Sequence, residues 1–198
     1  GGLGSDVIDG GAGDDSFISS AGNDSIIGGT GSDILDISGF TGPVTVNLDG
    51  NAGTITGNGT DNVSGIEQVI GSAGNDVFMG GTGSDTLSGG AGSMDSLTFG
   101  DATCAVTIDM AAGSATGFGS HVFSDFEVVI GSSYGDTITS EDSSGADFTI
   151  DGGDGDDIIY ANVGDDSVVG GSGNDTLSYN LNISTAITVV FASLGTGS

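Results

Sequence analysis

The sequence predicts an all-β fold, a flattened solenoid in which short parallel strands alternate with tight turns. A nine-residue phrase (glycine, glycine, any, glycine, any, aspartate, any, large apolar, any) recurs through most of the 198 residues, and residues 28–36 show it in full. The glycines suit a tight turn because they adopt positive φ at little cost. The last three positions have room for one short strand with one buried apolar side chain. Two nonapeptides therefore close one turn of a parallel coil.

The charge of the chain limits what it binds. It carries a net charge of −28 with no lysine or arginine, while 35% of its residues are hydrophobic. So high a charge is typical of disorder, but the valine, isoleucine and leucine residues fall at fixed places in the period, which favours a folded chain. Such a chain must import its cations. The absence of basic side chains also excludes nucleic acids and anionic membrane surfaces as expected partners, and no apolar run approaches the ~20 residues that a membrane-spanning helix needs.

The aspartate at the sixth place of each turn, here called the position-six aspartate, indicates which cation is imported. Its carboxylate lies beside backbone carbonyls of the turn that point inward. Ca²⁺ accepts six to eight hard oxygen ligands of this kind in a tolerant geometry. The sequence therefore predicts several Ca²⁺ ions bound in the turns.

These repeats resemble the RTX ("repeats in toxin", or hemolysin-type calcium-binding) family. The resemblance implies a right-handed parallel β-roll in which each calcium lies between turns two repeats apart, on one edge of the roll. The ion would take carboxylate oxygens from the position-six aspartates and carbonyl oxygens from the turns. The resemblance also implies a chain that stays unfolded at low calcium, leaves the cell by a type I-like route and folds at the cell surface or beyond it.

Taken in order, the chain alternates two kinds of block, and we expect them to form one elongated solenoid over residues 1–198. Residues 1–36 hold four nonapeptides, whose apolar places are filled by Val7 or Ile8, Phe17, Ile26 and Leu35. Residues 37–70 leave the period, and the alternation in residues 44–48 predicts a half-buried strand. Residues 71–98 return to the period, with one extra residue, Met94, in the third turn.

A super-repeat of about 60 residues follows from comparing the blocks. Residues 106–110 match residues 44–48, and residues 125–130 match residues 65–70, so residues 99–130 form a second strand block. We interpret these blocks as wider rungs of the same solenoid, because about 33 glycine-rich residues are too few for a core of their own. Residues 131–178 form the third repeat block, and residues 179–198 begin a third strand block at residues 187–191. We expect the chain to continue at both ends.

The candidate metal ligands are the twelve position-six aspartates. They are Asp6, Asp15, Asp24, Asp33, Asp76, Asp85, Asp95, Asp136, Asp147, Asp157, Asp166 and Asp175. The predicted pairs are Asp6–Asp24, Asp15–Asp33, Asp76–Asp95, Asp136–Asp157, Asp147–Asp166 and Asp157–Asp175. Six ions would bring about twelve positive charges against 28 negative ones. Half-filled outer turns and calcium held between molecules, along or between rods, both stay open.

No constellation of residues predicts an enzyme. The single histidine, His121, excludes metal sites built on histidine pairs, and we expect it to be structural. Glu67 and Glu127 hold equivalent places in the two strand blocks, and we expect them to accept backbone N–H groups. Cys104 is alone, which excludes an internal disulfide, and we expect it to be a small buried apolar residue.

Two functions fit these observations. In the first, the chain is an extracellular structural calcium-binding region that folds on binding Ca²⁺ and forms a rigid rod in an adhesin, surface-layer or filament protein. In the second, it is the calcium-dependent folding and secretion region of an RTX enzyme or toxin whose active domain lies outside these residues. A carbohydrate- or ice-binding face of threonine and asparagine is less favoured, because the outward positions are irregular.

Overall fold

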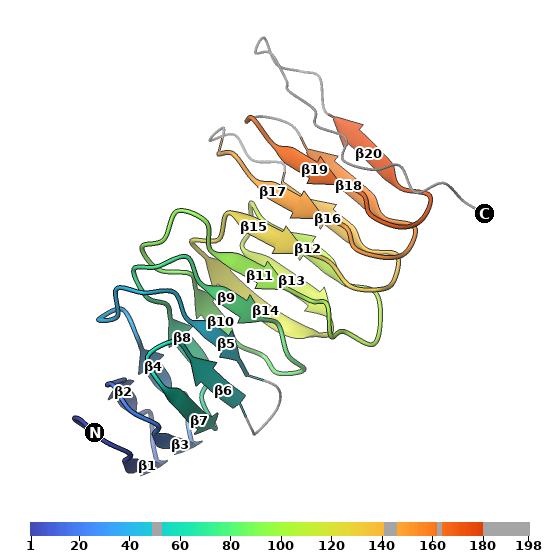
Figure 1. Ribbon diagram of the computed structural model, residues 1–198. Helices are drawn as coiled ribbons and strands as arrows, with labels where there is room; N and C mark the ends of the chain where they lie inside the picture. The colour runs from blue at the N-terminus through green and yellow to red at the C-terminus, as the bar shows by residue number, and fades with distance from the viewer. Residues whose placement is uncertain (49–52, 141–145, 162–163, 180–198) are drawn as a thin grey trace. The chain divides into compact units, whose positions relative to one another are not determined.

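The computed structural model describes residues 1–48, 53–140, 146–161 and 164–179 (Figure 1). All regular secondary structure in these residues is β-strand, which confirms the predicted all-β class. The chain divides into two compact units, Gly1–Leu97 with Gly119–Phe126, and Thr98–Phe118 with Glu127–Ser198. Each unit is described separately, and β11 (Ser96–Thr98) contributes residues to both.

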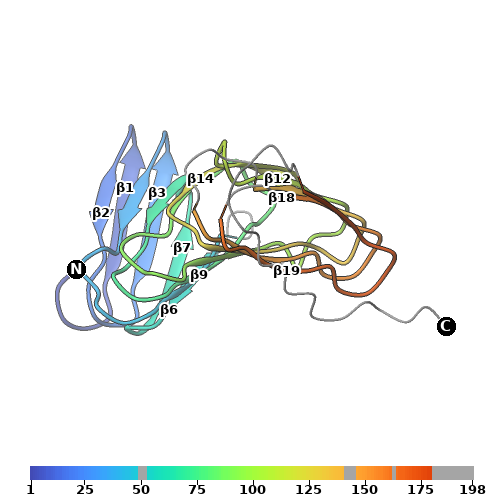
Figure 2. The ribbon, with the colours of Figure 1, turned by 90° about the horizontal axis from the view of Figure 1, so that it is seen from above.

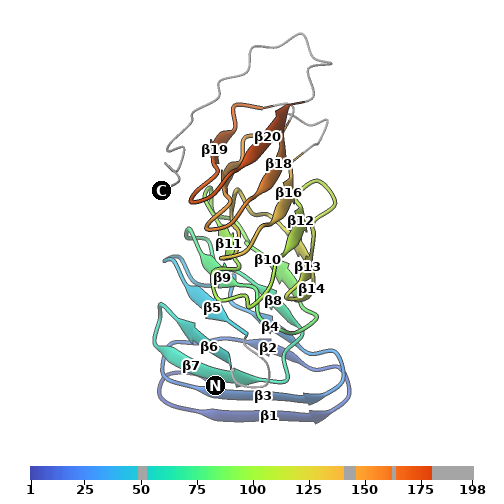
Figure 3. The same ribbon diagram turned by 90° about the vertical axis from the view of Figure 1, so that its right-hand side faces the viewer.

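The first unit contains two sheets of short strands. One has the order β1-β3-β7-β6-β5-β9, with β1 (Val7–Ala12), β3 (Ser25–Thr30), β7 (Thr60–Ser64), β6 (Gly53–Thr56), β5 (Thr45–Asn47) and β9 (Val77–Met79). The other has the order β2-β4-β8-β10-β14, with β2 (Ser16–Ile18), β4 (Ile34–Asp36), β8 (Gln68–Ile70), β10 (Thr86–Ser88) and β14 (Gly119–Ser124). Strands β1, β3 and β7 lie side by side in this order (Figures 2 and 3).

The strand register confirms that two nonapeptides make one coil. In the first sheet Val7 pairs with Ser25, and in the second Ser16 pairs with Ile34, both in parallel. Each partner is 18 residues further along the chain, which is two repeats. Consecutive nonapeptides therefore alternate between the two sheets, so every other turn lies on the same edge.

The first strand block differs from a simple wide rung because it folds back on itself. Strand β6 pairs antiparallel with both β5 and β7. Val44, Val46 and Leu48 are buried, which confirms the strand predicted over residues 44–48. The periodicity did not reveal the reversal, because a hairpin preserves the inward and outward alternation of its strands.

The second unit repeats the same design. One sheet has the order β15-β17-β19, with β15 (Val128–Ile130), β17 (Thr149–Asp151) and β19 (Ser167–Val169). The other has the order β13-β12-β16-β18-β20, with β13 (Ser114–Gly117), β12 (Thr107–Asp109), β16 (Thr137–Thr139), β18 (Ile158–Ala161) and β20 (Thr176–Tyr179), as Figure 3 shows. Here β12 and β13 form the antiparallel pair, and the remaining pairs are parallel. The strand predicted over residues 187–191 lies outside the described residues.

Each unit is filled by the central residue of each short strand. Phe17, Ile26 and Leu35 are buried as predicted, whereas Ile8 in the first strand is only half-buried. Burying a large apolar side chain contributes about 1.5–3 kcal/mol, so one such residue per strand is the main apolar stabilisation available to a rung. The expectation for Cys104 is wrong, since its side chain is exposed. It lies in the turn before β12, outside the positions that point inward.

Candidate calcium sites

The aspartates that the structure buries are the position-six aspartates. Nine aspartates are buried in the described part of the chain, and each holds the position-six place of its turn, with Asp95 displaced by the extra residue Met94: Asp24, Asp33, Asp61, Asp76, Asp85, Asp95, Asp136, Asp157 and Asp166. Burying a carboxylate is costly unless it is paired with a cation or fully hydrogen-bonded. Since the chain has no lysine or arginine, these carboxylates need either hydrogen bonds or an imported ion.

A ladder of hydrogen bonds accounts for one oxygen of these carboxylates. The backbone N–H of Asp6 donates to Oδ1 of Asp24 over 2.9 Å, and that of Asp15 donates to Oδ1 of Asp33 over 2.8 Å. The same bond joins Asp76 to Asp95 (2.7 Å), Asp136 to Asp157 (2.7 Å) and Asp157 to Asp175 (3.1 Å). Five of the six predicted pairs are therefore brought together on neighbouring coils.

Four position-six carboxylates have an oxygen that is buried without a hydrogen bond. Oδ2 of Asp6, Asp15, Asp33 and Asp157 is buried and makes no hydrogen bond. An acceptor left in this state costs about 1–3 kcal/mol, and more when it is charged. These four oxygens are the observation that tests whether a cation fits the turns.

Backbone carbonyls converge on the same place. At the first glycine of the turn, an added Cβ at Gly28 would lie 2.6 Å from Oδ2 of Asp33 and would overlap the carbonyl oxygen of Gly65 on the next coil. At Gly10, an added Cβ would overlap Oδ2 of Asp15 and lie 2.8 Å from the carbonyl oxygen of Gly28. The first glycine is thus required by the close approach of two kinds of oxygen to one point.

This donor set fits Ca²⁺ and not a softer metal. In the described residues no group of three or more His, Cys, Asp or Glu side chains converges on one point. A metal here would be held by position-six carboxylates together with turn carbonyls, which are the hard oxygen ligands that Ca²⁺ accepts. When bound, the ion would supply positive charge to the oxygens that make no hydrogen bond.

Two other position-six carboxylates are satisfied by the chain itself. The backbone N–H of Ser72 donates to Oδ2 of Asp76 (2.6 Å), and the Ser72 hydroxyl lies 2.7 Å from Oδ1. Ser132 makes the same two contacts with Asp136, with 2.8 Å between the hydroxyl and Oδ1. Each serine replaces the second glycine of its turn, in the first turn after a strand block. The turns therefore fall into a glycine class and a serine class.

Two ladder members lie outside the twelve predicted aspartates. Oδ1 of Asp61 accepts the backbone N–H of Asp24 over 2.8 Å, and the signal for it was present, since residues 57–61 keep the last two glycines and the aspartate of the turn phrase. Oε2 of Glu67 accepts the backbone N–H of Asp33 over 2.8 Å. This confirms the role expected for Glu67, and it shows that glutamate can fill the sixth position.

Asp147 does not lie at the sixth position of its turn. Its Oδ1 accepts the backbone N–H of Asp165, while the backbone N–H of Phe148 donates to Asp166 over 3.0 Å. Phe148 therefore takes the place expected for Asp147, and the predicted Asp147–Asp166 pair is off by one residue. The cause is the strand that follows. Burial of Ile150 fixes the register, because a shift by one residue would turn Thr149 inward instead.

Burial also affects the protonation of these carboxylates. The pKa of Asp157 is raised to about 6, chiefly by burial and also by the nearby charges of Asp136, Asp175 and Asp151, although the hydrogen bond from the Asp136 N–H lowers it. Burial likewise raises the pKa of Asp61 above its usual range. Without a metal, both carboxylates therefore take up a proton at a higher pH than an exposed aspartate does.

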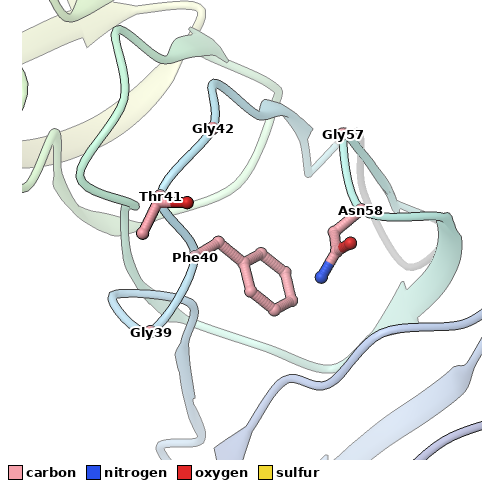
Figure 4. Close-up of a pocket in the computed structure, with 6 residues that line it drawn as sticks. All are labelled: Gly39, Phe40, Thr41, Gly42, Gly57 and Asn58. Atoms are coloured by element: carbon pink, nitrogen blue, oxygen red, sulfur yellow. The ribbon is translucent and has the colours of Figure 1, made fainter.

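The hollows of the first unit separate into two kinds. One, of about 210 Å³, is lined by Gly39, Phe40, Thr41, Gly42, Gly57 and Asn58, and holds no ionisable side chain (Figure 4). Another, of about 320 Å³, lies between the turns of Glu67 and Asp85 and has both carboxylates in its lining. These two residues are 18 positions apart, the spacing of a ladder pair, so this hollow has the composition of a cation site.

The comparison with family models decides the identity of the repeats. The RTX calcium-binding nonapeptide repeat matches in four copies, over residues 1–35, 61–93 and 149–177. The chain carries RTX calcium-binding nonapeptide repeats. The second matched segment of the RTX repeats begins at Asp61, in agreement with its place in the ladder.

The RTX repeats make this chain a calcium-binding repeat region, and the RTX repeat itself is a structural element without catalytic residues. A search of curated proteins finds no match. In the part of the chain that the structure describes, no helix is long and apolar enough to cross a membrane.

Proposed function

We propose that this chain is an extracellular structural region that folds when it binds calcium and stiffens an adhesin, surface-layer or filament protein. The observation that carries the proposal is the set of buried Oδ2 atoms without hydrogen bonds in Asp6, Asp15, Asp33 and Asp157. They recur at the sixth position of the RTX turn, where the fold brings carbonyl oxygens next to them.

Charge makes folding and binding one event in this proposal. The chain has a net charge of −28, and its carboxylates stack on neighbouring coils without any lysine or arginine between them. Its glycines also make the turns costly to order, at about 1–2 kcal/mol per residue of backbone entropy. Calcium offsets both the repulsion between the carboxylates and the entropy cost of the turns. We therefore expect an unfolded chain without calcium, as in small domains that fold only with their metal.

The composition supports a location outside the cell. A chain that folds only with several Ca²⁺ ions stays unfolded where calcium is scarce and folds where calcium is abundant. This property suits export through a type I-like route followed by folding at the cell surface. We further propose that the units continue one solenoid, and that calcium can join copies along or between rods.

Circular dichroism tests the folding claim. The far-UV spectrum in a chelator should lack β-sheet signal, and Ca²⁺ should restore it cooperatively. Matched additions of NaCl and MgCl₂ control for screening of charge and for divalent charge alone. A full β-sheet spectrum in the chelator, or equal folding with Mg²⁺, would contradict the proposal.

Light scattering in the same titration tests the filament role. Growth into large assemblies that a chelator reverses supports calcium between molecules. Compaction to a stable monomer would contradict self-association and leave the folding claim intact.

A further inference from the structure

The second residue of the repeat turn differs between turns that are otherwise alike. It is glycine in the turns of Asp6, Asp15, Asp33 and Asp157, and serine in the turns of Asp24, Asp76 and Asp136. Every carboxylate of this glycine set has a buried Oδ2 that makes no hydrogen bond. Every carboxylate of the serine set has a hydrogen bond from the serine of its own turn. Among these turns, the second residue therefore separates the carboxylates that need a cation from those that do not.

Glycine at the second place gives the turn a backbone shape that serine avoids. In the glycine set this residue has a positive φ, which is 103° at Gly2, 92° at Gly11, 114° at Gly29 and 96° at Gly153. Residues with a side chain rarely adopt this region, and neither Ser72 nor Ser132 has a positive φ. The exchange of glycine for serine therefore changes the path of the backbone beside the carboxylate.

In the turn of Asp76, the serine satisfies both carboxylate oxygens. The backbone N–H of Ser72 donates to Oδ2 over 2.6 Å, and the Ser72 hydroxyl lies 2.7 Å from Oδ1. Oδ1 also accepts the N–H of Val44 on the neighbouring coil over 2.8 Å. Asp33 is the opposite case, because its hydrogen bond from Asp15 leaves Oδ2 without a partner.

The Ser72 hydroxyl also lies where an ion would join two coils. Its Oγ is 2.9 Å from the carbonyl oxygen of Gly42 on the neighbouring coil, and it accepts the N–H of Gly74 over 3.0 Å. The hydroxyl thus connects a position-six carboxylate to a turn carbonyl, which are the two kinds of oxygen that Ca²⁺ would bind at about 2.3–2.6 Å. An ion cannot take this place while the hydroxyl is there.

The turn of Asp136 repeats the arrangement in the second unit. The N–H of Ser132 donates to Oδ2 of Asp136, and the Ser132 hydroxyl lies 2.8 Å from Oδ1. Oδ1 again accepts an N–H from the neighbouring coil, that of Val106, over 2.8 Å. Ser72 and Ser132 are 60 residues apart, and each lies in the first turn after a strand block. The serine turn is therefore a feature of the super-repeat.

We propose that serine at the second place closes a turn to calcium, so that Asp76 and Asp136 bind no ion beside their Oδ2 atoms. The N–H and hydroxyl of the serine satisfy the carboxylate that an ion would satisfy in a glycine turn. The closed turn still belongs to the ladder, because the N–H of Asp76 donates to Asp95 over 2.7 Å. This inference rests on the proposed calcium binding and names the residue that decides which turns take part in it.

Counting bound calcium tests the assignment, by equilibrium dialysis and atomic emission on the full chain at saturating Ca²⁺. Ser72→Gly removes the hydroxyl and admits a positive φ, so this variant should bind one ion more than the wild type. Ser72→Ala is the matched control, because it removes the hydroxyl and keeps the Cβ. Its backbone N–H should stay on Oδ2 of Asp76, and the number of bound ions should stay that of the wild type.

A folded Ser72→Gly variant with the wild-type number of ions would overturn the inference. Loss of one ion in both variants would also overturn it, since the hydroxyl would then be a calcium ligand. Should Ser72→Gly fail to fold, Ser132→Gly decides by the same count.

The reciprocal variant, Gly11→Ser, covers the case in which neither glycine variant folds. An added Cβ at Gly11 has nothing within 4 Å, and this variant should bind one ion fewer, so an unchanged number would overturn the inference. A wild-type chain that binds no calcium is a different result, because it would refute the proposed function before any variants are compared.

Discussion

Replacing Asp33 by asparagine tests the roles of the two oxygens of a ladder carboxylate separately. Asp33 is fully buried, its Oδ1 accepts the N–H of Asp15 over 2.8 Å, and its Oδ2 makes no hydrogen bond. Asparagine keeps the volume and the accepting oxygen at the first place. It replaces the second oxygen by an uncharged NH₂ group, so only the charge and the proposed metal ligand are lost.

We expect Asp33→Asn to change the stability of the fold in opposite directions with and without calcium. Without calcium, Asp33→Asn removes an unsatisfied buried acceptor that costs about 1–3 kcal/mol, so the variant should have at least as much residual structure as the wild type. With calcium, one bound ion stabilises the fold by about 2.7 kcal/mol when its concentration is 100 times Kd. Loss of the Asp15–Asp33 site should therefore destabilise the variant by about that amount.

Urea unfolding at saturating calcium measures the loss of stability, and the far-UV circular dichroism spectrum in a chelator measures the residual structure. Asp14→Asn is the matched control, because Asp14 is exposed and its Oδ1 accepts the N–H of Ser32, a bond that asparagine keeps. The control should change stability by less than about 0.5 kcal/mol. An unchanged stability of Asp33→Asn in calcium, or less residual structure than the wild type in the chelator, would refute the reasoning.

Three further predictions follow from single contacts. Gly28→Ala should lower the free energy of unfolding in calcium by more than about 2 kcal/mol, because the added Cβ meets a carbonyl oxygen and Asp33. Gly39 lies in open space, so Gly39→Ala should change the free energy of unfolding by less than about 1 kcal/mol. Equal effects of the two variants in urea unfolding would contradict this prediction. Ser72→Ala should lower the free energy of unfolding by about 1.5–3 kcal/mol in the same assay, since it removes a hydroxyl 2.7 Å from the buried carboxylate of Asp76. An unchanged stability would show that the Asp76 carboxylate does not depend on this hydroxyl. The pKa of Asp157 is raised from 3.8 to about 6, so protonation stabilises the metal-free fold below about pH 4 and this contribution is lost as the pH rises through about 6. Calcium must displace that proton, so calcium titrations should show weaker binding at pH 5 than at pH 7, and Asp157→Asn should reduce the difference.

The repeat phrase was enough to predict the fold and most of the ladder. Asp6, Asp15, Asp24 and Asp33 are in strict register with their glycines, and the structure pairs them as expected. The register follows from the repeat phrase because a repeat of this length has room for one inward-pointing strand residue and one carboxylate beside the next coil. Asp95 stays paired with Asp76 in spite of the extra residue Met94, which is exposed.

The failures come from places where packing overrides the phrase. Asp147 follows Gly145 at the interval of the repeat phrase, yet the need to bury Ile150 moves Phe148 into the sixth position. Asp61 lies in β7, whose antiparallel pairing with β6 leaves no trace in the period, so its turn was read as part of a strand block.

Anomalous scattering from crystals grown with calcium tests the central claim most directly. The account predicts anomalous peaks beside the buried Oδ2 atoms of Asp15, Asp33 and Asp157, each between carbonyl oxygens of neighbouring turns. Peaks confined to exposed aspartates such as Asp14, with water or no density beside the buried oxygens, would contradict it.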